Sequence, residues 1–247
     1  MELPALTTAE WVLAMLCGLL IGISKTGISG AGIAVVPIFA LIFGGKPSTG
    51  LLLPMLIVAD VFAVSYYNRH ASWKHIIKLL PWAIAGIFIA LFTGNRISSS
   101  TFKVIIGIVI LISLIIIIIR EKNKLKIIPT QKAVGAVSGL SGGFATMIGN
   151  AAGPILSIYL LSMRLPKSVF IGTGAWFFFI VNIFKVPLHI FVWNTITLNT
   201  LYFNLLMIPS IGAGIYAGIK FVSILPEKGF RYIVIVTTFI SSLLLLL

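Results

Sequence analysis

Two charged residues of this 247-residue sequence stand inside long apolar runs: Asp60 in LLLPMLIVADVFAV and Lys185 in FFFIVNIFKVPLHIFVW. A charge in such a run costs roughly 3 kcal/mol on membrane-insertion scales, so each residue needs a partner or a function. Asn182 precedes Lys185 by one helical turn, and an ammonium together with an amide can hold an oxyanion. We expect Asn182 and Lys185 to bind an anion. For Asp60 the sequence leaves two roles open, a coupling site for a proton or another ion and a carboxylate bonded to a neighbouring helix.

A glycine-rich segment occurs twice, at 18–37 and 135–154, with a constant offset of 117 residues. The aligned pairs are Gly18 and Gly135, Gly22 and Gly139, Ser24 and Ser141, Gly32 and Gly149, and Pro37 and Pro154. Each copy is apolar at both ends and rich in Gly, Ser and Thr in the middle, which is typical of a helix that breaks inside an apolar environment. We expect the two copies to face each other and to form one site.

The two breaks, SKTGISGAG at 24–32 and TMIGNAAG at 146–153, add candidates for anion binding. A helix that begins after a break presents unpaired N–H groups and the positive end of its dipole, and both favour an anion. The candidates are Ser24, Lys25, Thr26, Gly27 and Gly30 in the first break and Thr146 and Asn150 in the second. Tight helix packing is the alternative explanation for the small residues, but it does not explain Lys25.

Composition requires a membrane around these elements. The chain is 59% hydrophobic and 9% charged, with a mean hydropathy of +1.15, whereas soluble domains are about 25% charged. The apolar runs are continuous rather than alternating, which predicts an all-α integral membrane protein. Most basic residues flank these runs, so the net charge of +13 reflects topology and we expect no nucleic-acid partner. Neither a metal-ligand cluster nor a phosphate-binding loop is visible, so we expect no metal and no cofactor.

The apolar runs predict two repeats joined by a basic linker. The expected elements are a first repeat 1–119 with a hairpin at 9–43 and helices at 49–67, 76–94 and 101–119, a linker at 120–132, and a second repeat 133–247 with a hairpin at 133–163 and helices at 168–191, 198–219 and 229–247. Each hairpin piece is short against the ~20 residues needed to cross a membrane, so crossing and re-entry both stay open. Each half has an odd number of crossings, which together with the duplication predicts inverted structural repeats, each with a broken hairpin and about three transmembrane helices.

The distribution of basic residues predicts the orientation. If successive loops alternate sides, 14 of the 18 Lys and Arg residues fall on the side of the linker and three on the other, with Lys185 inside a helix. The positive-inside rule then places the linker in the cytoplasm and both termini outside. We expect a multi-pass protein of the cytoplasmic membrane whose partners are the lipid bilayer and a small anionic substrate. Homo-oligomer formation stays open.

The doubled glycine-rich segment ending in Pro, the SKTGISGAG break, Asp60 in VADVFAV and the Asn182–Lys185 pair in VNIFKVP resemble the sulfite exporter TauE/SafE family of membrane permeases. The resemblance covers nearly the whole chain. It implies a permease that moves sulfite, sulfoacetate or another organosulfonate across the cytoplasmic membrane. In the second break GNAAGP stands in place of the run of glycines common in the family, and the substrate can differ between subgroups. Inverted repeats with broken helices favour alternating access, with a gradient of protons or other ions as the energy source.

Two other functions use some of the same residues. A passive anion channel could use the hairpins as a filter. An intramembrane serine protease could use Ser141, in the GxSxG pattern of 139–143, with His189 on a later helix. Ser141 has a counterpart in the first repeat, Ser24, which a catalytic nucleophile does not need. We therefore expect a transporter rather than an enzyme.

Overall fold

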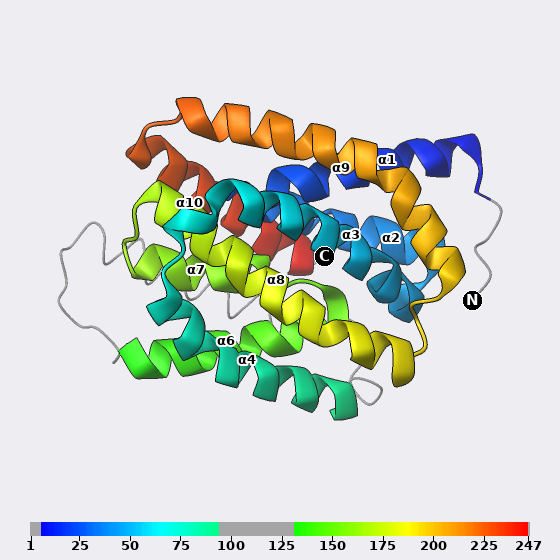
Figure 1. Ribbon diagram of the computed structural model, residues 1–247, viewed down its shortest axis with the longest axis horizontal. Coiled ribbons are helices and arrows are strands. Elements are labelled where there is room, and N and C mark those ends of the chain that lie inside the picture. Colours follow the sequence, from blue (N-terminus) through cyan, green and yellow to red (C-terminus); the bar gives the residue numbers. More distant parts are fainter. Residues whose placement is uncertain (1–5, 94–130, 247) are drawn as a thin grey trace.

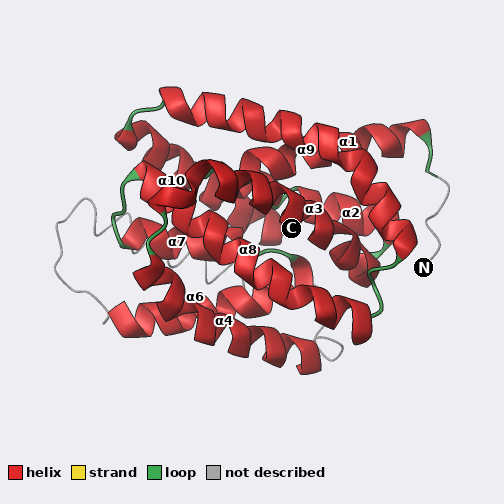
Figure 2. Cartoon of the chain, viewed as in Figure 1, coloured by secondary structure: helices red, strands yellow, loops and turns green. Residues whose placement is uncertain are grey.

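The computed structural model describes residues 6–93 and 131–246, and all regular structure in these ranges is helical (Figure 1, Figure 2). The α-helices are α1 (Thr8–Ser24), α2 (Val35–Phe43), α3 (Gly45–Tyr67), α4 (Trp73–Thr93), α6 (Gln131–Gly149), α7 (Gly153–Ser162), α8 (Lys167–Phe191), α9 (Leu198–Ile224) and α10 (Glu227–Leu246), with short 3-10 helices η1 (Ser29–Gly32) and η2 (Asn68–His70). The predicted all-α class is confirmed. The helix predicted at 101–119 and nearly all of the linker predicted at 120–132 lie outside the described residues.

Four of the described helices, α3, α4, α8 and α9, are long and apolar enough to cross a membrane. By contrast, α2 has 9 residues and α7 has 10. At 1.5 Å per residue each is about 15 Å long, half of the ~30 Å hydrocarbon core. The chain is therefore a multi-pass membrane protein in which α2 and α7 are too short to cross by themselves.

The helices pair across the two parts of the chain. In Figure 1, α1 lies beside α9 along one edge of the molecule and α4 lies beside α6 along the opposite edge, while α3 packs on α8 between them. The first helix of each part thus contacts the fourth helix of the other part. Such an exchange is expected of a chain that contains two similar halves.

Glycines let the paired helices come close, and they define the register between the halves. A Cβ atom on Gly22 would collide with the backbone of α9 at Ile211, and one on Gly143 would collide with the backbone of α4 at Ala83. Ala83 and Ile211 each lie two residues after the proline inside their helix, Pro81 of α4 and Pro209 of α9. In these contacts Gly22 corresponds to Gly143, whereas the ungapped alignment pairs it with Gly139. The two registers differ by one turn because the first break contains the extra turn η1.

That turn also interrupts the second half of the hairpin predicted at 9–43. Gly27 has a φ of 104°, a conformation that residues with a Cβ rarely adopt. Gly30 packs on Thr237 of α10 with no room for a Cβ atom. The backbone therefore turns through η1, and α2 begins only at Val35.

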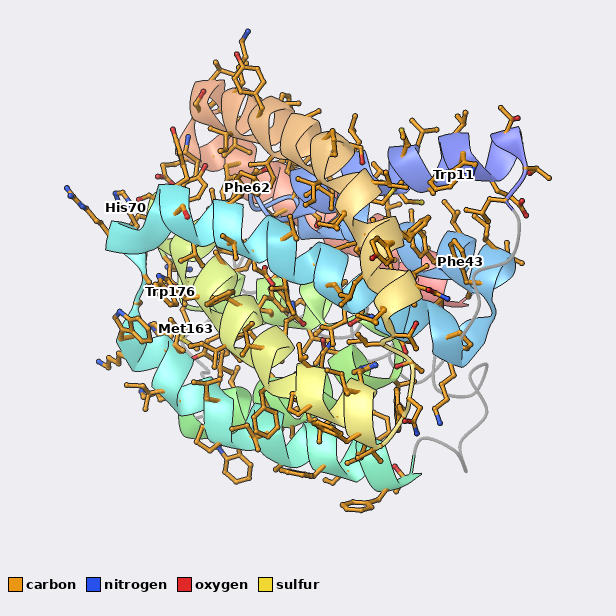
Figure 3. The ribbon with its side chains drawn as sticks, turned by 45° about the vertical axis from the view of Figure 1, so that its right-hand side comes forward. Trp11, Phe43, Phe62, His70, Met163 and Trp176 are labelled. Atoms are coloured by element: carbon orange, nitrogen blue, oxygen red, sulfur yellow. The ribbon has the colours of Figure 1, made fainter. Side chains whose placement is uncertain are left out.

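Large aromatic side chains mark the two ends of the molecule. Figure 3 shows Trp11 and Phe43 at one end and His70 and Trp176 at the other. The rings of Trp11 and Phe43 both contact Phe203 of α9, with centroid distances of 5.6 and 5.4 Å. Aromatic residues at both ends of a helical bundle are typical of the two membrane–water interfaces.

Candidate functional site

A cavity of about 60 Å³ lies where the two breaks meet. Its wall is formed by the end of α1, the turn that follows it, the second break, α7 and α8, with Leu56 from α3. The polar side chains in the wall are Ser24, Lys25, Thr146, Asn150, Ser157 and Asn182. The volume is enough for about four water molecules, or for one small anion.

Most of the candidates for anion binding line this cavity. Those in the wall are Ser24, Lys25, Gly27, Thr146, Asn150 and Asn182, from both breaks and from α8. The other three lie elsewhere. Thr26 packs against α9 at Gly218, Gly30 packs against α10, and Lys185 is fully buried outside the cavity wall. The fold thus brings the two breaks together at one site.

Asp60 connects the two halves behind the cavity wall. It lies on α3, about two turns from the C-terminal end of that helix, and its side chain is 0% exposed. One carboxylate oxygen, Oδ1, is 2.7 Å from Lys25 Nζ. The other, Oδ2, accepts a 2.7 Å hydrogen bond from Asn182 Nδ2. Asp60 is not itself in the wall, but it holds two side chains that are.

Lys25 has a second contact on the cavity side. Its Nζ lies 4.6 Å from the centre of the Phe178 ring, which also lines the cavity. The face of an aromatic ring attracts a cation, and this attraction is stronger where water is excluded. Lys25 therefore sits between a carboxylate behind the wall and an aromatic ring in it.

Lys185, which lies on α8, is hydrogen-bonded to the second break. Its Nζ donates to the carbonyl oxygen of Thr146 at 2.9 Å, to the Thr146 hydroxyl at 2.9 Å and to Asn150 Oδ1 at 2.7 Å. An ammonium group has three protons, so these bonds use all of them. Thr146 lies in the last turn of α6, where the helix dipole presents negative charge to a cation. Lys185 therefore caps the end of α6 and shapes the second break.

Asn150 gives the second break its turn. Its φ of 54° lies in the left-handed region, which Asn tolerates better than most residues. Its Oδ1 accepts from Lys185, and its Nδ2 donates to the carbonyl oxygen of Thr49 on α3 at 3.1 Å. The second break is thus bonded to both α8 and α3.

The hydroxyl groups of the first break use their protons within the chain. Ser24 Oγ donates to the carbonyl oxygen of Ile21 at 2.7 Å, and Thr26 Oγ1 donates to that of Ile23 at 2.8 Å. In this geometry Ser24 offers the cavity oxygen lone pairs rather than a proton. Sequence reasoning missed Ser157, a wall residue on α7. The available signal was a lone serine in the apolar run that follows the second break.

The charges around the cavity sum to a positive value. The ammonium groups of Lys25 and Lys185 face a single carboxylate, that of Asp60. The surplus favours anions over cations in a region of low dielectric constant. In the described part of the chain, no group of three or more His, Cys, Asp and Glu side chains is placed to hold a metal ion.

The two residues of the alternative protease site have separate partners. Ser141 Oγ donates to the carbonyl oxygen of Val137 in its own helix at 2.6 Å, while His189 Nδ1 lies 2.8 Å from Thr195 Oγ1. Neither hydrogen bond connects the serine to the histidine. The fold therefore supplies no activated serine at this position.

An all-helical membrane protein with buried charges around a cavity between two broken hairpins has the features of a membrane transporter. A family model described as Sulfite exporter TauE/SafE matches residues 14–245. The chain belongs to this family, whose members are membrane transporters rather than enzymes. No curated protein and no solved structure matches it.

Proposed function

We propose that this protein is a secondary transporter that moves a small anion, such as sulfite, sulfoacetate or another organosulfonate, across the cytoplasmic membrane. The observation that carries the proposal is the cavity between the two breaks, with the Lys25 ammonium in its wall. Sulfite has four non-hydrogen atoms, a size that suits a space for about four water molecules. Membership of the sulfite exporter family agrees with this substrate class.

The residues of the site divide into those that touch the anion and those that support them. Lys25 supplies the charge, and Asn182, Thr146 and Asn150 orient the substrate from the other half of the chain. Lys185 acts through Thr146 and Asn150, which it holds in place. Thr26 and Gly30 support the first break through their contacts with α9 and α10.

Alternating access would come from two inverted repeats moving around this cavity. Two observations support the repeats. The α1–α9 and α4–α6 pairs exchange equivalent helices. Asp60 is hydrogen-bonded to Asn182, and these two residues begin the similar stretches DVFAV at 60–64 and NIFKV at 182–186, which align with each other. Contact between aligned residues is expected near an axis that relates two halves. A gradient of protons or of another ion drives transport, with Asp60 as the coupling residue.

The described basic residues support an orientation with the linker in the cytoplasm and the termini outside. One end of the molecule carries the end of α3 and the starts of α4, α8 and α10, and the basic residues of these segments and their loops are Arg69, Lys74, Lys78, Arg164, Lys167, Lys228 and Arg231. At the opposite end, the short connection from α2 to α3 is followed by Lys46. By the positive-inside rule the first end is cytoplasmic.

Uptake into proteoliposomes tests the proposal. We expect saturable uptake of labelled sulfite and of small sulfonates, and at least a tenfold loss of uptake in the Lys25→Gln variant, because one charge-assisted hydrogen bond is worth about 1.5–3 kcal/mol. The double variant Lys25→Gln/Asp60→Asn removes both charges of the pair and controls for a carboxylate left without its partner. Lys220→Gln, an exposed lysine of α9, is the matched control.

Two results would contradict the proposal. Uptake by Lys25→Gln equal to that of the wild type would remove Lys25 from the site. Wild-type flux that rises linearly with concentration and never saturates would indicate a passive channel instead.

A further inference from the structure

Asp60 binds two residues of the cavity wall, one from each half of the chain. It is ion-paired with Lys25 and hydrogen-bonded to Asn182, and it is fully buried behind them. An anion that enters the cavity meets a lysine whose charge is already neutralised. The substrate can bind Lys25 strongly only if the ion pair between Lys25 and Asp60 breaks.

The Asn182 amide is turned the wrong way for an anion in this state. A carboxylate only accepts hydrogen bonds, so Asn182 directs its Nδ2 group to Asp60. Its Oδ1 atom is buried and has no hydrogen-bond partner in the described part of the chain, although the side chain is only 1% exposed. Asn182 is a residue of the cavity wall, and in this orientation its unpartnered atom is an acceptor, which cannot donate a hydrogen bond to an anion.

We propose that the Asp60 carboxylate and the anionic substrate are alternative partners of Lys25, and that the Asn182 amide turns over when Asp60 takes up a proton. This inference rests on the proposed transport of an anion. It makes the protein a proton–anion cotransporter with a stoichiometry of one proton to one monovalent anion.

Protonation of Asp60 makes both Lys25 and Asn182 available to the anion. The neutral carboxyl group releases Lys25 and, through its new O–H group, donates to Asn182 Oδ1. The amide rotates by half a turn to accept that bond, so its NH₂ group faces the cavity and can donate to the anion. The proton comes from the water on the side where the substrate enters, and it leaves with the substrate on the other side.

The buried charge is the same before and after this exchange. Without substrate, Lys25 is balanced by Asp60. With substrate, Asp60 is neutral and the anion balances Lys25. The other charged group that faces Asp60 is Lys185, from α8, and it keeps its three acceptors throughout. In the described parts of α2, α6 and α9, which also pack near α3, no charged side chain acts on Asp60.

Infrared difference spectroscopy on the wild-type protein tests the exchange directly. The probe is methanesulfonate, whose single negative charge does not change between pH 5 and pH 8. We expect its addition near neutral pH to produce the C=O band of a protonated carboxyl group, together with uptake of one proton per anion bound. The band should be absent from Asp60→Asn. Binding of methanesulfonate without this band and without proton uptake would overturn the inference.

Two variants separate the parts of the mechanism. Asp60→Asn cannot take up a proton, so it should bind methanesulfonate equally well at pH 5.5 and pH 7.5 and lose accumulation driven by a pH gradient. Asn182→Leu removes the amide but leaves the Lys25–Asp60 pair, so its binding at pH 5.5 should fall about tenfold. Wild-type affinity that does not change with pH would contradict the inference.

The outcome for this inference is distinguishable from that for the proposed function. If the wild type binds neither methanesulfonate nor sulfite at any pH, the proposed function is wrong. If it binds and transports them with no proton, only the exchange at Asp60 is wrong. The infrared measurement on the wild type decides this even if Asp60→Asn does not fold.

Discussion

The two breaks each involve one buried lysine, but in opposite ways. In the first, Lys25 lies in the break and its partner, Asp60, lies on a long helix. In the second, Lys185 lies on a long helix and its partners, Thr146 and Asn150, lie in the break. Lys25 has a counter-ion and lines the cavity, whereas Lys185 is bonded to three neutral acceptors outside the cavity wall.

This difference distinguishes an exchangeable cation from a structural one. A lysine paired with a carboxylate can change partners when the carboxylate is protonated or when another anion arrives. A lysine that donates to a helix end and to a turn leaves polar acceptors unpaired when it moves away. Under the exchange proposed above, the first break responds to substrate and the second stays in place.

Replacement of Lys185 should produce the largest effect on stability. In Lys185→Met, the Thr146 hydroxyl and Asn150 Oδ1 lose the Lys185 donor, while the Thr146 carbonyl oxygen keeps the Asn150 N–H at 3.1 Å. Each polar group left unsatisfied costs about 1–3 kcal/mol. We expect a loss of at least about 2 kcal/mol, measured as unfolding in detergent micelles by tryptophan fluorescence. Lys220→Met, at an exposed site of α9, should change stability by less than ~0.5 kcal/mol.

The double variant Lys25→Met/Asp60→Asn gives the matching measurement for the first break. If Lys25 is the exchangeable cation, this variant loses uptake but less stability than Lys185→Met, because it removes both charges of the pair and leaves no unpaired buried carboxylate. A larger loss of stability in Lys25→Met/Asp60→Asn than in Lys185→Met would reverse the comparison.

The glycine contacts should behave alike in the two halves. Gly22→Ala and Gly143→Ala each place a Cβ against the backbone of the paired helix, and overpacking of this kind costs about 1–3 kcal/mol. Thermal unfolding should show similar losses for the two. Gly212→Ala is the control, since no packing partner beyond the adjacent backbone of its own helix lies within 4 Å of the added Cβ. A loss in only one of Gly22→Ala and Gly143→Ala would show that these glycines are not equivalent.

Replacement of a turn residue should have the smallest effect on stability. Both breaks turn at a residue with positive φ, Gly27 at 104° and Asn150 at 54°, but only Asn150 has a side chain to hold the turn. Asn150→Gly keeps the backbone conformation and loses the bonds to Lys185 and Thr49, so we expect a loss of about 1–2 kcal/mol in the same unfolding measurement. Lys185 still has Thr146, which keeps this effect below that of Lys185→Met. An unchanged stability would show that the Asn150 bonds do not hold the second break.

Much of the candidate site could be identified from residue types. Asp60, Asn182 and Lys185 were conspicuous because polar and charged groups are costly within apolar runs. The breaks were conspicuous because glycine and small polar residues interrupt the same runs. Residue types do not predict which side chains contact one another. The ion pair of Lys25 with Asp60 and the packing of Thr26 against α9 are visible only in the structure.

The membrane setting, the helical class, the two broken hairpins and the family can be predicted from the chain alone, because each depends on composition, on run length or on a motif read along it. Which lysine contacts the carboxylate, and which binds the second break, depends instead on how the helices pack. Those contacts depend on how far each helix is rotated and shifted against its neighbour. The glycine contacts of α1 with α9 and α6 with α4 set that rotation, and the extra turn η1 shifts it by one turn relative to the alignment.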